Sequence, residues 1–294
     1  MTRPVAVGVD GSPASLAAAD WGAREALLRD LPLRLVHAWE WQPYSHAPPA
    51  GLEAVRRWSE GVPQEVTDRL RRLHPDLDIT ADFVIGPPRQ VLCRAGKDAE
   101  ILVIGSTGVG RVAGFLLSSV SMATVAHAEA PVVLVRAGFS VGQPLSGAAP
   151  GPAPPVVLGL DLSRPCDEVI AFAFEAAAVR TATLTVVHGW NPPPYDLYGL
   201  GAALRFGTDL SADERERIRQ ALQPWRARYP GVDVTTQAVI GEPARHLLDA
   251  AVHAALVVIG RHRHMTRPSL PHVGHLAHAV LHHCPAPVAV VPHD

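Results

Sequence analysis

The sequence repeats itself at the length of a whole domain. "VAVGVDGSPAS", which starts at Val5, recurs as "VVLGLDLSRPC" from Val156, and "LRLVHAW" (33–39) recurs as "LTVVHGW" (184–190). "FVIGPP" (83–88) returns as "AVIGEP" (238–243), "ILVIGS" (101–106) as "LVVIGR" (256–261), and "APVVLVR" (130–136) as "APVAVVP" (286–292). The five matches keep their order at spacings of 151 to 156 residues, well above the roughly 20–50 residues of solenoid repeats. The chain is therefore predicted to be a tandem duplication of one domain.

The length of the chain agrees with two domains, because 294 residues exceed the roughly 100–200 typical of one. Between the copies lies "AGFSVGQPLSGAAPGPAPP" (137–155), in which Pro, Gly and other small residues predominate. Such a composition is typical of a linker. We predict a first domain over residues 1–137, a linker over 138–154 and a second domain over 155–294.

Each copy alternates short apolar runs with longer helical stretches, and Ser12 before Pro13 is a good N-cap for a first helix that runs through Arg29. Strands that are apolar on both faces and alternate with helices indicate a parallel sheet covered on both sides. The fold class predicted is α/β, with two tandem doubly wound, Rossmann-like domains. The first copy's strands are expected at 5–9, 33–38, 79–84, 101–104 and 132–135, and the buried face of its first helix at Leu16, Ala19, Ala23 and Leu27.

Composition excludes several classes of protein. The net charge of −2 does not favour a general nucleic-acid or membrane surface, and no apolar run approaches the ~18–20 residues of a spanning helix. The N-terminus lacks the apolar segment of a secretory signal. The three cysteines, Cys93, Cys166 and Cys284, form no CxxC pair. These features predict a cytoplasmic protein in a reducing compartment.

A glycine-rich stretch, "GSTGVGRVAGFLLSSVS" (105–121), follows the fourth predicted strand. In doubly wound sheets ligands bind beyond the carboxyl ends of the strands where strand order reverses. Asp10 follows the first strand and Gly105 the fourth, so both would face one crevice if those strands are neighbours. The three glycines Gly105, Gly108 and Gly110 permit positive φ and a close ligand, and the next helix start offers N–H groups to an anion.

Other phosphate-binding loops fit this stretch less well. A Walker loop needs a lysine, which is missing here, and a dinucleotide fingerprint belongs after a first strand, not a fourth. From the residues alone, a phosphate site and an ordinary glycine-rich loop both remain open.

Together, "VGVDGS" (7–12), "LVHAW" (35–39), "VIGPP" (84–88) and the pattern G-2x-G-9x-G-[ST] resemble the universal stress protein family in its tandem two-domain form. The resemblance covers nearly the whole chain except the linker and some loops. It implies a five-stranded parallel sheet of order 3-2-1-4-5 in each domain. It also implies ATP in the crevice between the first and fourth strands, with Mg²⁺ allowed but not required.

The resemblance also implies which residues meet the nucleotide. Gly8, Val9 and Asp10 would lie along adenosine, Ala38 would meet adenine, and Gly105 and Gly108 would lie along ribose and phosphates. Ser119 and Val120 would donate to phosphate oxygens. Ser118 stands where the family has a third glycine; we interpret it as a helix N-cap whose hydroxyl adds a contact. The predicted nucleotide-binding residues are Gly8, Val9, Asp10, Ala38, Gly105, Gly108, Ser118, Ser119 and Val120.

The second copy keeps less of this pattern. In "GRHRHMTRPSLPHVGH" (260–275), Arg263 replaces the second glycine, ten residues intervene instead of nine, and His275 replaces the serine. Asp161, Gly260 and Gly274 remain as weaker candidates. The nucleotide is therefore expected mainly in the first domain.

The histidines are predicted to be structural. His37 and His188 end equivalent strands and are interpreted as packed core residues with one hydrogen bond. Ten of the fifteen histidines lie between His246 and His293, with His275, His278 and His282 on one helical stripe. No Cys or carboxylate completes a tetrahedral set, so no metal site is assigned.

The sequence thus offers residues that could bind a nucleotide, but no residue to which a catalytic role is assigned. We predict an ATP-binding stress-response regulator that is not an enzyme, with slow ATP hydrolysis left open. A nucleotide-free interaction module of the same fold is the alternative. An adenylating enzyme is disfavoured because "VDGSPAS" replaces the SGGxDS-like loop that it needs. The family implies dimerisation through the fifth strands, so a homodimer and an unknown protein partner are expected, with no nucleic acid or membrane partner.

Overall fold

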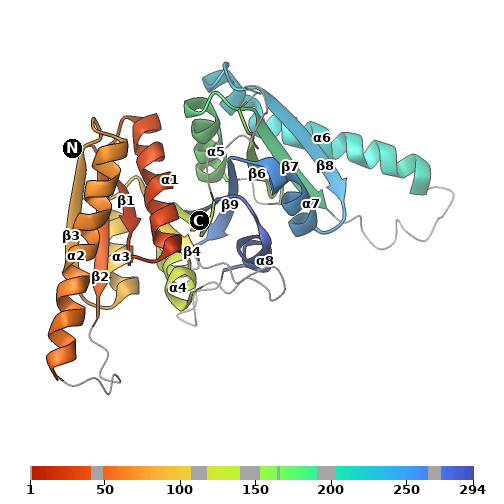
Figure 1. Ribbon diagram of the computed structural model, residues 1–294. Coiled ribbons are helices and arrows are strands. Elements are labelled where there is room, and N and C mark those ends of the chain that lie inside the picture. The colour runs from red at the N-terminus through yellow and green to blue at the C-terminus, as the bar shows by residue number, and fades with distance from the viewer. Residues whose placement is uncertain are drawn as a thin grey trace. The chain divides into compact units, whose positions relative to one another are not determined.

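A computed structural model describes residues 2–40, 49–106, 118–139, 153–163, 166–190, 203–263 and 273–294. These residues form two compact units, each with its own sheet and helices, which are described separately (Figure 1). Unit 1 contains the first copy of the repeat and unit 2 the second. The predicted domain boundaries at residues 137 and 155 stay predictions, because residues 140–152 between them lie outside the described part of the chain.

Unit 1 alternates strands and helices from end to end. Its strands pair in parallel in the order β3-β2-β1-β4-β5, as the family resemblance implies. The order reverses between β1 and β4, which are hydrogen-bonded neighbours with Gly8 opposite Ile104. The elements are β1 (Val5–Gly8), α1 (Pro13–Arg29), β2 (Leu33–Trp39), α2 (Pro49–Leu73), β3 (Ile79–Ile85), α3 (Pro88–Lys97), β4 (Ile101–Ser106), α4 (Ser119–His127) and β5 (Val132–Arg136).

Helices cover both faces of the sheet in unit 1. Successive residues of β1 point to opposite faces: Val7 faces Gly22 of α1, whereas Gly8 faces Leu92 of α3. Helix α2 packs with α1, and α4 packs with α3, so each face carries one pair. The inner strands β1 and β4 and the strand β5 are buried along most of their length, which explains why they read as apolar runs, whereas β3 at the sheet edge is partly exposed.

Helix α1 begins as predicted but buries a different stripe. Ser12 (φ −72°, ψ 155°) is the N-cap, and its hydroxyl accepts a bond from the N–H of Ser15. The predicted buried face is wrong at Leu27, which is 45% exposed. A side chain on Gly22 would begin 2.5 Å from Val7, so the strand approaches a stripe of small residues and the leucines turn outward. The buried positions are Ala14, Ser15, Ala18, Ala19, Trp21, Gly22, Ala23, Glu25 and Ala26.

Unit 2 repeats the topology. Its strands pair in parallel in the order β8-β7-β6-β9-β10, which is equivalent to that of unit 1. Gly159 faces Leu247 of α7 as Gly8 faces Leu92. The elements are β6 (Val156–Gly159), α5 (Asp167–Val179), β7 (Leu184–Trp190), α6 (Ala203–Arg228), β8 (Val234–Ile240), α7 (Pro243–Ala250), the 3₁₀ turn η2 (Ala251–His253), β9 (Leu256–His262), α8 (His275–His283) and β10 (Val288–His293).

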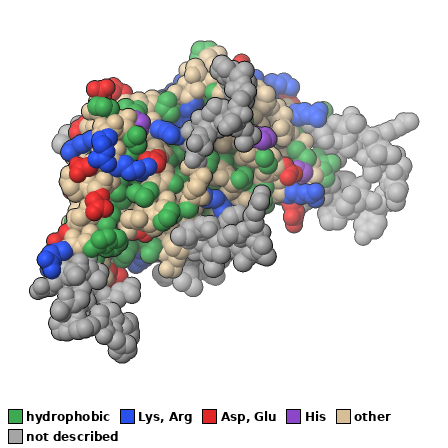
Figure 2. Space-filling view, in the orientation of Figure 1, with side chains coloured by type: hydrophobic (Ala, Val, Ile, Leu, Met, Phe, Trp, Pro, Cys, Tyr) green, Lys and Arg blue, Asp and Glu red, His purple; other side chains and the backbone are tan. Residues whose placement is uncertain are grey.

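On the face shown in Figure 2, Lys and Arg side chains lie among acidic, hydrophobic and neutral ones, and the described residues there form no large region of one sign. Within the ranges that the structure describes, none of the helices combines the length and the apolar character that crossing a bilayer requires.

Candidate functional site

The loop after β1 is held by its own polar groups. The N–H of Val9 donates to Val36 O (3.0 Å), and the N–H of Asp10 donates to Ser15 Oγ (3.2 Å). The N–H of Ser12 in turn donates to Asp10 Oδ1 (2.9 Å), which is an Asx turn. Asp10 therefore shapes the loop that leads into α1, at the carboxyl end of β1.

The ionised form of Asp10 is favoured by this loop. Partial burial alone would raise the pKa of its carboxyl group. The hydrogen bonds from the Ser12 side chain and N–H, with a further one from Ser15, outweigh burial and hold the pKa below its usual value. A negative charge is thus maintained at the end of β1.

Gly105, the last residue but one of β4, lies against the first turn of α1. A Cβ at this position would lie 2.5 Å from Ala14 C, 2.6 Å from Ala14 O and 2.7 Å from Ser15 N. Gly105 does not use the positive φ that glycine permits, because among the described glycines only Gly11, Gly86, Gly138 and Gly241 have positive φ. The close approach of helix to strand is sufficient to explain why this position is glycine.

The start of α4 is tied to the end of β4. Ser118 (φ −62°, ψ 148°) is the N-cap, as interpreted from the sequence, and its Oγ accepts the N–H of Ser121 (3.0 Å). Ser121 Oγ donates to Gly105 O (3.1 Å), so the hydroxyl proton of Ser118 is left for Ser121 Oγ (2.8 Å). The Ser118 hydroxyl is thus engaged within the fold.

The N–H groups of Ser119 and Val120 belong to the first turn of α4, which helix geometry leaves without intrahelical acceptors. They lie at the carboxyl end of β4, next to β1, where the sheet order reverses. A helix of nine residues also carries a partial positive charge at this end. The described groups that an anion can meet here are therefore backbone donors.

The remaining predicted residues of unit 1 lie around the same edge. Gly8 ends β1 with Leu92 packed against it, since a Cβ there would lie 2.8 Å from Leu92 Cδ2. Ala38 is half-buried near the end of β2, opposite Val84. Gly108, with the rest of the loop 107–117, lies outside the described residues.

His37 is a buried structural residue, as predicted, with more bonds than expected. Its side chain is 4% exposed, and Nδ1 lies 2.6 Å from Val9 O while Nε2 lies 2.8 Å from Ser59 Oγ. Since a carbonyl only accepts, Nδ1 carries the proton and Nε2 accepts from Ser59 in the neutral ring. Both ring nitrogens are therefore used to fix α2 and the loop after β1.

Sequence reasoning missed three serines that build this edge: Ser15, Ser59 and Ser121. Each hydroxyl fastens a helix to a strand end or to the loop after it. The sequence gives little indication of their structural role, because serine is common near helix starts. Only the serine-rich "SSVS" (118–121) pointed to an N-terminal cluster.

Comparison with protein-family models matches the universal stress protein family over residues 1–136 and 153–292. A universal stress protein of Mycobacterium tuberculosis is 32% identical over an alignment of 296 positions, which covers 97% of this chain and 96% of the relative. A second one from the same species is 30% identical over 313 residues, covering 99% and 96%. The chain belongs to the universal stress protein family.

The tandem form of the family is also seen in structure. The crystal structure of a universal stress protein from Archaeoglobus fulgidus superposes with a TM-score of 0.70 at 16% identity, over 99% of this chain and 98% of that one. At this identity the likeness concerns the fold alone. The two segments that match the family model, 1–136 and 153–292, confirm two family domains in one chain, as the internal repeat predicts.

The second family domain of the chain keeps the acidic loop of the first. Asp161 Oδ1 accepts from the N–H (2.9 Å) and the hydroxyl (2.6 Å) of Ser163. Burial would raise the pKa of Asp161, but these bonds, with His188 and His262 nearby, lower it. The two strand ends thus present equivalent carboxylates.

The other candidates of unit 2 lie in changed surroundings. A Cβ on Gly260 would lie 2.7 Å from His293 Nε2, so a side chain from β10 abuts it. Gly274 is the N-cap of α8, with φ −51° and open space around it. Because neither Gly274 nor Ser118 has positive φ, the N-cap position of the family pattern does not require glycine.

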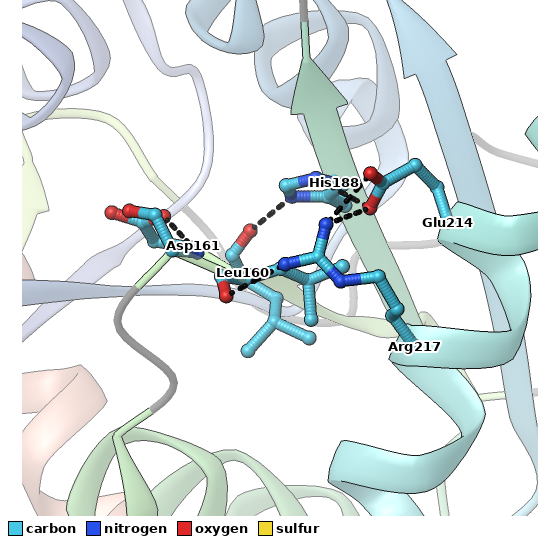
Figure 3. Close-up of polar contacts among 7 residues, drawn as sticks. Leu160, Asp161, His188, Glu214 and Arg217 are labelled. Atoms are coloured by element: carbon cyan, nitrogen blue, oxygen red, sulfur yellow. Dashed lines mark hydrogen bonds and ion pairs between the residues drawn. The ribbon is translucent and has the colours of Figure 1, made fainter. Parts of the chain in front are cut away.

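His188 differs from its counterpart His37 in its second partner. Its Nδ1 donates to Leu160 O (2.9 Å), but its Nε2 faces Glu214 Oε2 at 3.6 Å (Figure 3). Arg217 Nη1 lies 2.7 and 3.0 Å from the two Glu214 oxygens. Both side chains reach from α6 toward the ends of β6 and β7, so charged groups occupy this edge of unit 2.

The predicted histidine stripe lies on one helix. His275, His278 and His282 all belong to α8, and the rings of His278 and His282 are 4.2 Å apart between centroids. Over the described ranges, no three His, Cys, Asp or Glu side chains are placed to hold a metal ion.

A separate groove of about 200 Å³ lies between β2–β3 and α3 of unit 1. Arg34, Val84, Ile85, Val91 and Arg94 are among its lining residues. The predicted site residues are not among them, so this groove and the edge at β1 and β4 are separate features of unit 1.

Proposed function

We propose that this universal stress protein binds an adenine nucleotide, ATP first, at the carboxyl edge of β1 and β4 in unit 1. The bound or empty state of this edge would serve as a regulatory signal in a stress response. The observation that carries the proposal is the meeting of the Asp10 loop and the start of α4 on two neighbouring strands.

Phosphates fit the α4 side of this edge. The first-turn N–H groups of Ser119 and Val120 are donors without intrahelical acceptors, and the helix end adds a partial positive charge. Such a seat needs no lysine, which matches the presence of only one lysine, Lys97, in the chain. The Ser118–Ser121–Gly105 bonds hold the seat in place before any ligand arrives.

The sugar fits the Asp10 side. The carboxylate of Asp10 is kept ionised, and one of its oxygens, Oδ1, shapes the loop. A ribose hydroxyl can donate a hydrogen bond, and an ionised carboxylate is a strong acceptor for it. Asp10 therefore serves the loop and the ligand together, as the family resemblance implies.

The proposal is for a binding protein and not for an enzyme. A general base needs a free lone pair near the reacting group. Both nitrogens of His37 are engaged with Val9 and Ser59, so the histidine of this edge is committed to the fold. We therefore expect no ATP turnover beyond slow background hydrolysis.

The first experiment asks what the purified protein carries. We expect heat denaturation to release an adenine nucleotide, identified by ion-exchange chromatography, and added ATP to raise the melting temperature of the protein stripped of nucleotide. Asp10→Asn should weaken ATP binding by at least about tenfold, since a charge-assisted bond contributes on the order of 1.5–3 kcal/mol. The matched change in unit 2, Asp161→Asn, should weaken it far less. No released nucleotide together with no melting shift would refute the proposal.

A homodimer, a protein partner and a cytoplasmic location belong to the same proposal. Light scattering at micromolar concentration is expected to give twice the chain mass of 31.3 kDa. The mass of a single chain would remove the dimer and leave the nucleotide proposal standing.

A further inference from the structure

A large aromatic side chain stands exposed beside the loop that contains Asp10. Trp58 of α2 is 59% exposed. Its Cζ2 and Cη2 atoms lie 3.6 and 3.7 Å from the point where a side chain on Gly11 would begin. Gly11 has φ +80°, which an L side chain rarely adopts, and Val62 lines the same spot at 3.6 Å. The six-membered ring of the indole therefore lies next to a bare stretch of backbone.

The position of Trp58 is fixed by its neighbour. Ser59 is buried, and its hydroxyl lies 2.8 Å from His37 Nε2. The other nitrogen of His37 bonds to Val9 O at 2.6 Å. A chain of two hydrogen bonds thus joins the turn of α2 that carries Trp58 to the residue before Asp10.

The fold itself uses little of this indole. Trp21 of the same unit is buried, with 4% exposure, which is what a tryptophan that stabilises a core shows. Exposed tryptophan beside a polar loop is typical of recognition, because the ring offers a large apolar face that loses little conformational entropy on binding. The planar partner best suited to such a face is a nucleobase.

The duplication provides an internal comparison. Helices α2 and α6 end alike: the N–H of His74 donates to Leu70 O, and that of Tyr229 donates to Trp225 O. These pairs are 155 residues apart. At this spacing Asp213, Glu214 and Arg217 stand where unit 1 has Trp58, Ser59 and Val62.

The loop after β6 differs from the loop after β1, as helix α6 differs from helix α2. Leu162 stands where unit 1 has Gly11, and Arg217 Nη2 donates to Leu162 O (3.4 Å) while pairing with Glu214 (Figure 3). Unit 2 thus ties its long helix to the loop through charged groups, at the place where unit 1 exposes an aromatic ring. Three of the four compared positions carry charged side chains in unit 2, and the fourth, glycine in unit 1, carries a leucine.

We propose that Trp58 is the base-stacking residue of unit 1 and that its absence from unit 2 directs the nucleotide to the first domain. This inference rests on the proposed function, which places an adenine nucleotide beside Asp10. Binding energy then comes from two separate sources, phosphate contacts at α4 and stacking at α2. Adenosine, which lacks phosphates, should depend on Trp58 most.

The test uses the full-length protein with Trp58→Ala, Trp58→Phe and the control Leu73→Ala. Leu73 is similarly exposed, at 58%, and ends the same helix at its opposite end. By calorimetry, Trp58→Ala should raise the Kd for ATP at least about fivefold, as base stacking on aromatic side chains predicts. Trp58→Phe should keep most of the affinity, and Leu73→Ala all of it.

Tryptophan fluorescence provides a readout that does not depend on the stability of the alanine variant. A base stacked on the indole should quench the wild-type emission, and Trp58→Phe should abolish that change while ATP still binds. ATP binding to Trp58→Ala as tight as to the wild type, or quenching that persists in Trp58→Phe, would overturn the inference and leave the proposed function intact. A wild-type protein that binds no ATP would overturn both.

Discussion

The substitution Gly105→Ala separates two explanations for a glycine of the family pattern. If the position is glycine because the backbone of α1 lies against it, a methyl group must destabilise unit 1 with or without nucleotide. If the reason is only the approach of a ligand, the methyl group should spare the fold and weaken binding. The contact distances favour the first explanation, because the nearest atoms, at 2.5–2.7 Å, are backbone atoms of Ala14 and Ser15.

The expected size of the effect follows from this geometry. A contact of 2.5 Å falls about 0.9 Å short of ordinary van der Waals distance, and backbone atoms cannot move aside as a side chain does. Overpacking of this kind costs about 1–3 kcal/mol, and we expect a value near the upper end. That corresponds to a lowering of the melting temperature of unit 1 by about 10 °C.

A second glycine-to-alanine substitution in the same unit is a control that is expected to change stability in the opposite direction. Gly61 is inside α2, and a Cβ there would have only Glu65 Oε1 nearby, at 3.9 Å. Alanine in a helix interior is more stable than glycine by roughly 0.5–1 kcal/mol. Gly61→Ala should therefore stabilise the unit that Gly105→Ala destabilises.

Urea unfolding followed by circular dichroism, with hydrogen exchange of peptides from α1 and β4, measures both changes and assigns them to unit 1. Separate transitions are expected for a two-domain chain, and the comparison concerns the transition in which those peptides lose protection. A Gly105→Ala protein within 0.5 kcal/mol of the wild type would show that α1 and β4 do not meet as described, and the steric reasoning would fail.

Three further predictions concern the polar groups of unit 1. Ser59→Ala removes the donor to the buried Nε2 of His37 and should cost about 1–3 kcal/mol of unfolding free energy in a urea titration. Ser118→Gly should change the stability of α4 by only a few tenths of a kcal/mol while Ser118→Ala costs about 1 kcal/mol, since glycine is a tolerated N-cap and alanine is not; equal effects in hydrogen exchange of α4 would contradict this. Because the pKa of Asp10 is lowered on folding, its stabilising contribution is present above the unfolded value near pH 4 and is lost as the pH falls through the folded pKa. The difference in melting temperature between the wild type and Asp10→Asn should thus be constant from pH 7 to about pH 5 and disappear below about pH 4. A difference that is independent of pH would contradict the stabilising role of the ionised Asp10 carboxylate.

The sequence pattern was sufficient to predict two doubly wound α/β domains, because hydrophobic periodicity and the internal repeat both point to this fold class, whereas the strand order came from the family resemblance. Strands buried on both faces leave an unambiguous apolar signal, and the duplication allows each strand to be identified twice.

The buried face of α1 was harder to predict. Leu27 follows the helical spacing of apolar residues, yet the close approach of β1 at Gly22 turns the small residues inward instead. Hydrophobic periodicity alone gives no weight to glycine and alanine as close-packing residues.

The sequence predicted where the candidate residues lie better than it predicted why each residue type is found there. Asp10 and Ser118 stand where the pattern placed them, and Ser118 is the N-cap that its residue type suggested. Gly105 was expected at the site for backbone freedom, whereas its contacts give it a packing role with ordinary φ. Ser59 and Trp58 had no sequence signal, because their meaning depends on how α2 crosses the ends of β1 and β2. A pattern along the chain cannot register a contact between elements 50 residues apart.

The comparison of the two copies shows how one fold supports two different edges. His37 and His188 keep the same backbone bond from Nδ1, to Val9 O and Leu160 O, so the strand end is preserved in both. What changes is the group that meets Nε2, a hydroxyl in unit 1 and a carboxylate in unit 2. A carboxylate in this place calls for a cation, and Arg217 provides one from the next turn of the same helix. Arg217 also donates to Leu162 O, so the charged edge of unit 2 depends on the exchange of Val62 for Arg217 together with that of Ser59 for Glu214.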